Sequence, residues 1–430
     1  MKSINKKQLF IASCLSLLVT SLSFGIRAGI LNRLGVEFKL DASELATIAG
    51  TAFWGFPLAV IIGGMLVDAL GMKHLLVAAF ILHLIGIFLT IFAGGFWSLF
   101  ISTLFIGLAN GTVEAACNPL VISIYPNNKT TKLNHFHLWF PGGILIGTLI
   151  VYFFDKLGIS WQVQVAVMAI PTLVYGYLFS RLNFPVTERV ASGVSTRQMY
   201  RSLLTPLYIF MLVCMLGTAI TELFTGQWID VLLRNVSDNA ILLLTIETGV
   251  MVIGRGIAEP VVKRFSPSGV LLVSAILSAV GLYILGHTDG NMLFVGAVIF
   301  GMGVCYFWPT MLGFVSENLP NTGAIGLNLL GGAGMLAVSV YMMFMGGYYD
   351  RLLGNKLPAG SELSAYTNAP PGSEMSDVLN TAKKAAGPEI INATLLIPIF
   401  LIIAFIGLII YMRKRKFADN PSAQETSLSN

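Results

Sequence analysis

Twelve long apolar stretches are the feature that most constrains how this chain can fold. Each approaches or exceeds the roughly 20 residues that an α-helix needs to cross the hydrocarbon core of a bilayer. Inside lipid every backbone polar group must be satisfied internally, and runs of this length favour helices over a barrel. The sequence therefore predicts an all-α membrane protein with twelve transmembrane helices. The stretches lie near residues 8–31, 43–69, 74–94, 98–124, 134–155, 161–180, 205–231, 239–262, 268–287, 291–315, 322–348 and 389–411.

The composition excludes several classes of protein. Only 11% of the residues are charged, against roughly 25% in soluble domains. The four cysteines all fall within apolar stretches, so we expect no disulfide framework. The net charge of +5 is spread over the ends of the stretches, which argues against a nucleic-acid partner. We find no nucleotide motif, metal cluster or nucleophile set, and expect a protein that is not an enzyme and needs no cofactor or metal.

Lysine and arginine predict the orientation in the membrane. If the N-terminus is cytoplasmic, sixteen of the 26 basic residues lie in cytoplasmic segments, eight lie in outer segments and two lie within spans. This excess agrees with the positive-inside rule and with an even number of spans. We therefore expect both termini in the cytoplasm.

The chain divides into two similar halves. Residues 1–181 and 205–412 would each form six helices, with a cytoplasmic connection at 182–204 and a cytoplasmic tail at 413–430. The outer connection at 350–388 is rich in Gly, Pro and Ser, and part of it, 373–386, is compatible with a surface helix. The ends of spans two and eight carry matching glycines, one acid and basic residues. This layout is typical of secondary transporters whose halves rock around a central site.

Glu114 is the most informative single residue, because it lies in the middle of an apolar span. A carboxylate at that depth costs a few kcal/mol unless it faces a cavity or a partner, so it marks a functional site by default. Asn110, Glu114 and Asn118 are spaced by four residues and form one polar stripe on a helix. A polar stripe on a span must face away from lipid. This pattern favours a water-filled path with a titratable group in it, and the alternative is a structural acid between helices.

A second mid-span acid, Glu222, shares a helix face with Thr218 and Thr225, and Gln227 and Trp228 follow. An acid, an amide and an indole suit a sugar, since hydroxyls need hydrogen-bond partners and the apolar ring face stacks on aromatic rings. In span eleven, Asn328 is a further candidate ligand. In span three, His83 is better explained as a histidine satisfied between helices.

Several motifs resemble those of a known transporter group. The segment Gly64-x3-Asp68-x2-Gly71-x-Lys73 is similar to the loop motif of the major facilitator superfamily. Within it, the chain resembles the fucose/galactose–proton symporter family over roughly residues 20 to 350. The motifs that carry this second resemblance are Val113-Glu114-Ala-Ala-Cys-Asn118-Pro119-Leu120, Lys132-Leu-Asn134 through Gly142, Gly254-Arg255 through Pro267, Tyr306-Phe-Trp-Pro309-Thr310 and Leu330-Gly331-Gly332.

The resemblance implies the major facilitator fold and import of a neutral hexose or deoxyhexose together with a proton. Glu114 corresponds to the acid of the family's fourth span, and His137 to a sugar-binding glutamine of the fifth. Asn134 forms an i, i+3 pair with His137, for which a capping role is the alternative. The resemblance also implies a bacterial cytoplasmic membrane and a single working chain.

One departure from the family keeps other functions open. The acid expected in span one is missing near Ala28, and Arg27 stands beside that position. Arg27 could snorkel to the outer interface, pair with Glu114, or clamp the carboxylate of a sugar acid such as a hexuronate or aldonate. An equilibrative sugar uniporter and a sugar sensor that does not transport are the remaining alternatives.

Four charged residues at the cytoplasmic ends of spans two and eight are candidates for a gate. We expect Asp68, Lys73, Arg255 and Glu259 to form contacts that hold the halves in one state, with ordinary helix-end charge as the alternative.

Overall fold

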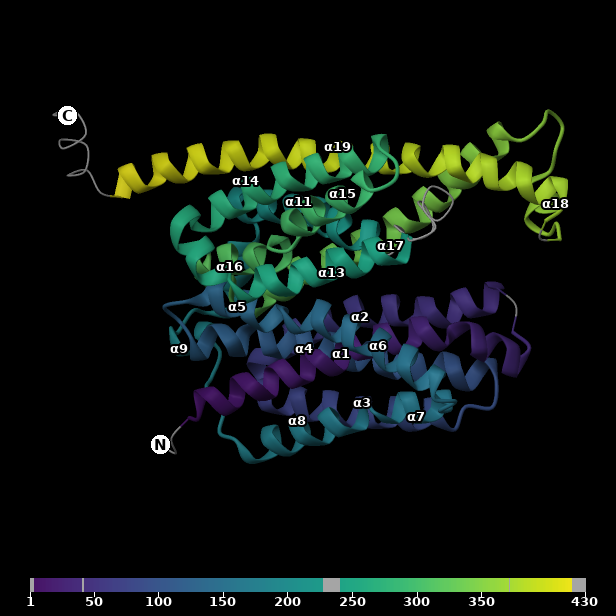
Figure 1. Ribbon diagram of the computed structural model, residues 1–430. Coiled ribbons are helices and arrows are strands. Elements are labelled where there is room, and N and C mark those ends of the chain that lie inside the picture. The colour runs from purple at the N-terminus through teal and green to yellow at the C-terminus, as the bar shows by residue number, and fades with distance from the viewer. Residues whose placement is uncertain (1–3, 41, 227–239, 371, 420–430) are drawn as a thin grey trace.

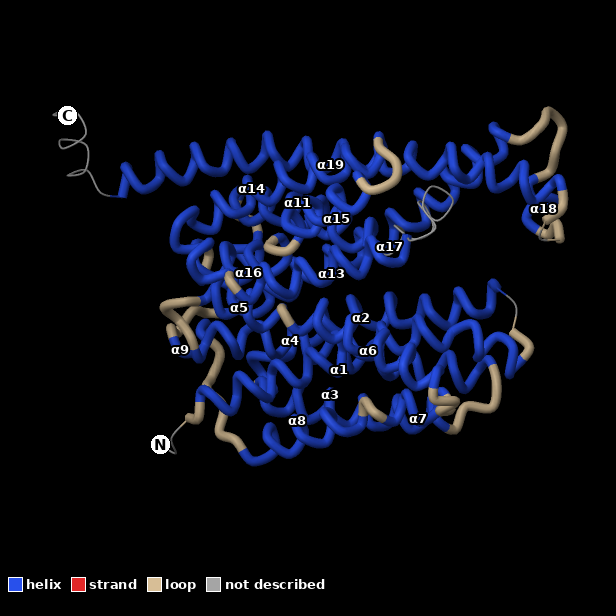
Figure 2. Tube along the Cα trace, in the orientation of Figure 1, coloured by secondary structure: helices blue, strands red, loops and turns tan. Residues whose placement is uncertain are grey.

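The computed structural model describes residues 4–40, 42–226, 240–370 and 372–419, and the elements among them are helical (Figures 1 and 2). Two helical bundles lie one above the other in Figure 1, one built from the first part of the chain and one from the second. The short helices α9 (Glu188–Ala191) and α10 (Thr196–Leu203) lie on the connection between them.

The first bundle is built from long apolar helices, two of which are divided. α5 and α6 together make one span, as do α7 and α8. The helices are α1 (Lys6–Phe38), α2 (Ala42–Leu70), α3 (Met72–Ile91), α4 (Phe96–Ile124), α5 (Lys129–His137), α6 (Trp139–Lys156), α7 (Trp161–Ala166) and α8 (Ala169–Arg181).

The second bundle has more interruptions, and these lie near the centre of the molecule. A π-helical segment, η1, follows α11, and a turn at residues 305–306 separates α15 from α16. The elements are α11 (Pro206–Ala219), η1 (Ile220–Phe224), α13 (Ala240–Gly256), α14 (Ala258–His287), α15 (Met292–Val304), α16 (Phe307–Asn318), η2 (Pro320–Thr322), α17 (Gly323–Lys356), α18 (Leu363–Thr367) and α19 (Glu374–Asp419).

The predicted all-helical membrane fold is confirmed. Eleven helical segments among the described residues are long and apolar enough to cross a membrane. The remaining expected span contains α13, which has 17 residues and directly follows residues 227–239, outside the described part. The start of α1 and the end of α19 lie at the same end of the molecule in Figure 1. We call this the basic end, since the charge distribution predicts it to be cytoplasmic.

The segment 350–388 is more helical than the sequence suggested. α17 continues to Lys356, and residues 374–388 are the first turns of the 46-residue helix α19 rather than a separate surface helix. An ion pair of 2.6 Å between Lys356 Nζ and Glu389 Oε1 ties the end of α17 to α19. The polar composition of these turns reflects their position outside the apolar part of the helix.

Glycines let neighbouring helices touch through their backbones. A Cβ atom added at Gly281 in α14 would lie 2.5 Å from the backbone nitrogen of Phe300 in α15. At Gly143 it would lie 2.0 Å from Ser21 Oγ, which agrees with the packing role that small residues have in membrane helices. By contrast, Gly407 in α19 has open space on this side.

We predict that Gly281→Ala destabilises the protein, by about 1–3 kcal/mol, because the backbone of α15 cannot move aside as a flexible side chain could. Gly407→Ala is the matched control and should be neutral or stabilising, since alanine favours a helix over glycine. Thermal unfolding of both variants in detergent measures the difference. Equal melting temperatures for the two variants would contradict the packing described here.

Candidate functional site

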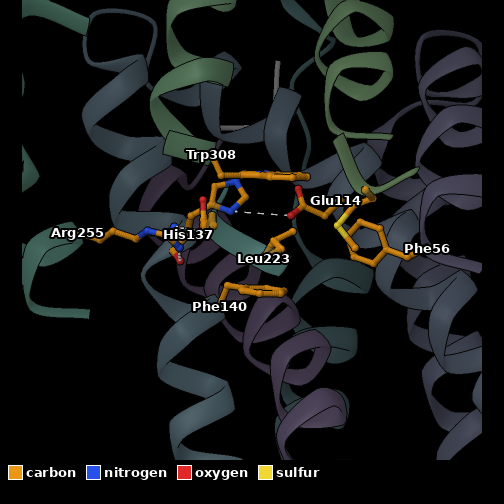
Figure 3. A pocket seen from close by; sticks show the side chains of 9 residues that line it. Phe56, Glu114, His137, Phe140, Leu223, Arg255 and Trp308 are labelled. Atoms are coloured by element: carbon orange, nitrogen blue, oxygen red, sulfur yellow. Dashed lines mark hydrogen bonds and ion pairs between the residues drawn. The ribbon is translucent and has the colours of Figure 1, made fainter. Parts of the chain in front are cut away.

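Glu114 is part of a chain of hydrogen bonds, and its carboxyl group lies close to the ring of His137 (Figure 3). It is 4% exposed. The Nδ2 atom of Asn118, one turn further along α4, donates to Glu114 Oε2 at 2.5 Å. His137 Nε2 lies 3.0 Å from Asn118 Oδ1, and His137 Nδ1 lies 3.8 Å from Glu114 Oε1. The amide of Asn118 thus links the acid to the imidazole.

This arrangement fixes where a proton can sit. Because Asn118 uses its nitrogen to donate to Glu114, its oxygen is the acceptor that faces His137. A neutral His137 therefore carries its proton on Nε2 and turns the lone pair of Nδ1 toward the carboxyl group. Protonating either Glu114 or Nδ1 adds a donor between the two groups, so the pair can hold one proton.

Arg255 of α13 connects this site to the second bundle. Its Nη2 donates to Glu222 Oε1 at 2.7 Å, its Nη1 to the backbone oxygen of His137 at 2.9 Å, and its Nε to that of Cys305 at 2.5 Å. Arg255 is 1% exposed and Glu222 is 4% exposed, so both charges of the pair are buried. One guanidinium thus contacts α5 of the first bundle, and η1 and the turn at residues 305–306 of the second.

Two prolines explain why these carbonyls are available. In a continuous helix the oxygen of His137 would accept from residue 141, and that of Cys305 from residue 309. Both residues are prolines, Pro141 and Pro309, and proline has no N–H group. The guanidinium of Arg255 donates to both freed oxygens instead.

Glu222 is presented by an irregular piece of helix. Residues 220–224 form the π-helix η1, a rare geometry that is frequent at functional sites. The Oε2 atom of Glu222 is buried and has no hydrogen-bond partner among the residues that the structure describes. The same is true of the indole nitrogen Nε1 of Trp308. The site therefore offers one free acceptor and one free donor.

Two narrow cavities meet between the bundles. The first, of about 20 Å³, is lined by Phe56, Glu114, His137, Phe140, Glu222, Leu223, Arg255, Trp308 and Met335. In Figure 3, Trp308 and Phe140 lie on opposite sides of the contact between His137 and Glu114. The second cavity, of about 90 Å³, shares Phe140, Glu222, Leu223 and Met335 with the first. Both are far smaller than the roughly 300 Å³ at which ligand pockets begin.

Three predicted ligands are used elsewhere in the molecule. Asn110 bonds to His83 and to Ser23, and His83 also bonds to Tyr175, so this histidine is satisfied between helices as expected. The amide of Asn134 donates to Thr130 O and Thr310 Oγ1. That of Asn328 donates to Ala115 O at 2.9 Å. These asparagines link helices, and neither cavity contains them in its described lining.

The remaining candidates are placed as follows. The guanidinium of Arg27 lies 5.1 Å from the centre of the Phe24 ring. Phe24 lines the second cavity, whereas Arg27 is absent from the described lining of both cavities. The structure therefore does not bring Arg27 to Glu114. Gln227 and Trp228 lie outside the described residues.

The four predicted gate residues do not meet, which corrects the expected grouping. Arg255 lies in the central site, while Glu259 is exposed and pairs with Lys263 at 2.6 Å. The span predicted near residues 239–262 assumed one continuous helix, but α13 ends at Gly256, before Glu259. Lys73 donates to the backbone oxygens of Ser180 and Leu182 near the end of α8.

Asp68 does take part in a contact at the basic end, with a partner that the sequence did not indicate. It accepts from Arg189 Nε at 2.6 Å and from Thr187 Oγ1. Arg189 belongs to α9, and its side chain packs against Gly323 at the start of α17. The connection between the halves thus touches both bundles.

A second set of contacts closes the same end directly. Lys129 Nζ lies 2.6 Å from Glu188 Oε1 and also donates to Ser316 O of α16 at 3.1 Å. Thr130 Oγ1 donates to Glu317 Oε1 at 2.6 Å. These bonds join α5 of the first bundle to α16 of the second. The structure is therefore closed at the basic end.

Comparison with known proteins identifies the family. The family model described as Major Facilitator Superfamily matches residues 9–335. The chain belongs to this superfamily.

Among curated proteins, the facilitated glucose transporter member 10 of solute carrier family 2 from Xenopus laevis is 26% identical over 161 residues, covering 37% of this chain and 29% of that protein. A D-xylose transporter from Levilactobacillus brevis is 25% identical over 148 residues, 34% of this chain and 32% of its own length. The chain spans about a third of the length of these relatives.

Solved structures support the same fold. The fucose:proton symporter of E. coli in the outward conformation superimposes with a TM-score of 0.68 at 15% identity, over 91% of this chain and 98% of that one. A proton:xylose symporter gives 0.68 at 15% identity, over 91% and 94%. A bacterial homologue of the human lysosomal transporter Spinster gives 0.67 at 16% identity, over 93% and 96%. At these identities the likeness shows the fold alone. The family match and the curated relatives show a multi-pass transporter that is distantly related to sugar transporters.

We predict that Arg255→Gln destabilises the protein by about 3–5 kcal/mol, because it leaves the buried carboxylate of Glu222 without its counterion. The two proline-freed carbonyls would lose a donor as well. Thermal unfolding in detergent measures the loss.

The double variant Glu222→Gln/Arg255→Gln is the control, since it removes both charges. It should recover a large part of the lost stability, and the cycle isolates the energy of the pair. If the stability loss of the double variant equals the sum of the losses of the two single variants, Arg255 and Glu222 do not stabilise each other as a buried ion pair.

At the basic end we predict that Arg189→Ala opens the closed contacts, because Asp68 loses its charged partner and α9 its packing on Gly323. A cysteine placed at Ile122, which lines a cavity beside α9, should then react several-fold faster with a water-soluble thiol reagent. Arg197→Ala, at an exposed residue of α10, is the matched control. An unchanged labelling rate in Arg189→Ala would contradict the gate.

Proposed function

We propose that this protein imports a neutral hexose or deoxyhexose together with a proton, by alternating access. The observation that carries the proposal is the chain Glu114–Asn118–His137, buried between aromatic rings at the interface of the two bundles. It combines a group that can bind a proton with surfaces that suit a sugar. By resemblance, the membrane is the bacterial cytoplasmic membrane and the working unit a single chain.

The proton would be carried on Glu114. Burial favours the neutral form of a carboxyl group, whereas water favours the charged form. Glu114 would therefore hold its proton more tightly when the cavity is closed than when the cavity is open to water. One proton supplies about 2.3 kcal/mol per 100 mV of membrane potential. That is enough for roughly 40-fold accumulation of a neutral substrate, since each 1.4 kcal/mol corresponds to a factor of ten.

The sugar would bind between Trp308 and Phe140. Their rings offer faces on which the apolar side of a sugar ring can stack. Trp308 Nε1 and Glu222 Oε2 have no partner among the described residues, so sugar hydroxyl groups that accept from the first and donate to the second would satisfy them. A charged sugar acid has no comparable support, because Arg27 does not line this cavity in its described extent and Arg255 is occupied by Glu222.

Alternating access would require the central contacts to separate. The two cavities are too small for a hexose as they stand, so the bundles must move apart to admit one. The bond from Arg255 to the oxygen of His137 crosses the interface at this point. A sugar hydroxyl that replaces this bond on opening would couple substrate binding to the motion.

We predict that Glu114→Gln removes one transported proton, and so lowers proton-driven accumulation by roughly 40-fold for a driving force of 100 mV, while leaving sugar exchange across the membrane. Glutamine keeps the size and an acceptor oxygen of the side chain but cannot exchange a proton. The measurement is uptake of radiolabelled L-fucose, D-xylose and D-glucose by proteoliposomes, under a pH gradient and under exchange conditions. Glu362→Gln, at an exposed acid far from the site along the chain, is the matched control.

Proton-driven accumulation in Glu114→Gln that equals that of the unchanged protein would contradict the role of this residue. If the unchanged protein takes up one of these sugars but never against its gradient, the uniporter alternative holds instead.

A further inference from the structure

Glu247 is a buried acid that the mechanism above does not use. It lies on α13 and lines the second cavity together with Glu222, Thr248 and Phe24. Glu247 is 2% exposed. An added Cβ atom at Gly226 would lie 3.5 Å from Glu247 Oε1, so this oxygen is close to the end of span seven. The cavity thus brings two carboxyl groups from neighbouring spans together.

Both carboxyl groups have an oxygen left over. Within the described part of the chain, Glu222 Oε2 and Glu247 Oε2 are each buried without a hydrogen-bond partner. Buried polar atoms without a partner are rare in native proteins and call for an explanation. Two unpaired acceptors facing one small cavity fit a bound donor between them, and a proton on either oxygen is the smallest donor that serves.

Among the residues that the structure describes, no positive charge is left over to balance an ionised Glu247. Arg255, on the same helix, already pairs with Glu222 at 2.7 Å. The residues of α6 that line the cavity, Phe140, Pro141 and Ile144, are apolar, and α15 has no ionisable residue along its length. From α5, His137 contributes its backbone oxygen to Arg255. From α1, Phe24 lines the cavity, and Arg27, which stacks on the Phe24 ring, is absent from the described lining.

An ionised Glu247 would therefore be a buried charge beside an ion pair that is already neutral. Such a charge is costly, and a buried group avoids the cost by binding a proton. The same group becomes charged when the cavity opens to water.

We propose that Glu247 is a second proton-binding residue of the transport cycle, in the second half of the molecule and separate from Glu114. When the outer side of the cavity opens, a carboxylate oxygen of Glu247 takes a proton from a hydronium ion, which becomes water, and forms an O–H bond. The neutral group permits closure, and the proton returns to water when the opposite side opens. This inference rests on proton-coupled transport as the proposed function.

The first experiment needs no sugar. Infrared difference spectra of the purified full-length protein are recorded during a pH titration, in the region where protonated carboxyl groups absorb. The unchanged protein should show two buried components, of which Glu114→Gln removes one and Glu247→Gln the other. Glu362→Gln should leave both. If the spectrum of Glu247→Gln equals that of the unchanged protein, Glu247 does not bind a proton and the inference is overturned.

The second experiment tests coupling. Protons transported per sugar are measured from the reversal potential of L-fucose, D-xylose or D-glucose transport in proteoliposomes. Glu247→Gln should lower this ratio by one relative to the unchanged protein while sugar exchange continues. An unchanged ratio would overturn the coupling role and leave symport through Glu114 standing. Absence of proton-driven transport in the unchanged protein would overturn the proposed function, and the infrared component alone would then decide whether Glu247 binds a proton.

If Glu247→Gln fails to fold, Glu247→Asp replaces it, since aspartate keeps the carboxyl group and moves it. Its infrared component should shift rather than disappear. A spectrum identical to that of the unchanged protein would again overturn the inference.

Discussion

The contacts of Arg255 are the interaction on which the central site depends. A buried guanidinium needs acceptors, and here they come from one carboxylate and two backbone oxygens that prolines have left without helical partners. Because one of these oxygens belongs to α5 and the others to the second bundle, the same side chain links the two halves at the proposed substrate site. Removing a charge from such a set costs far more than its net contribution to folding.

Irregular backbone surrounds this arginine. The π-helix at residues 220–224 and the turn at 305–306 interrupt spans that otherwise satisfy their own hydrogen bonds. In a membrane such interruptions persist only where protein or water meets the freed groups. The site thus combines Glu114 on a regular helix, which can hold a proton, with a partner face built from broken helices. This division of roles suits a transporter whose halves must move relative to each other.

Much of the fold followed from the sequence, because long apolar runs leave a chain few alternatives in lipid. The position of Glu114 and its contact with Asn118 followed from helical spacing, and His137 from the family resemblance. The role of Arg255 did not follow from the sequence. The prediction treated residues 239–262 as one continuous helix, whereas α13 ends at Gly256. A proline four residues after His137 and another after Cys305 were the available signals. Arg189 could not have been found, because its contact with Asp68 depends on how α9 folds back.

The central claim is that one cavity binds both a sugar and a proton. The most direct test measures the protons exchanged when L-fucose, D-xylose or D-glucose binds, by calorimetry in buffers with different ionisation enthalpies. Binding free energies are linked reciprocally, so a site that couples the two must change its proton occupancy when it binds the sugar. Our account predicts a net proton exchange with the sugar that binds, and a loss of that exchange in Glu114→Gln. Tight binding with no proton exchanged at any pH would contradict it.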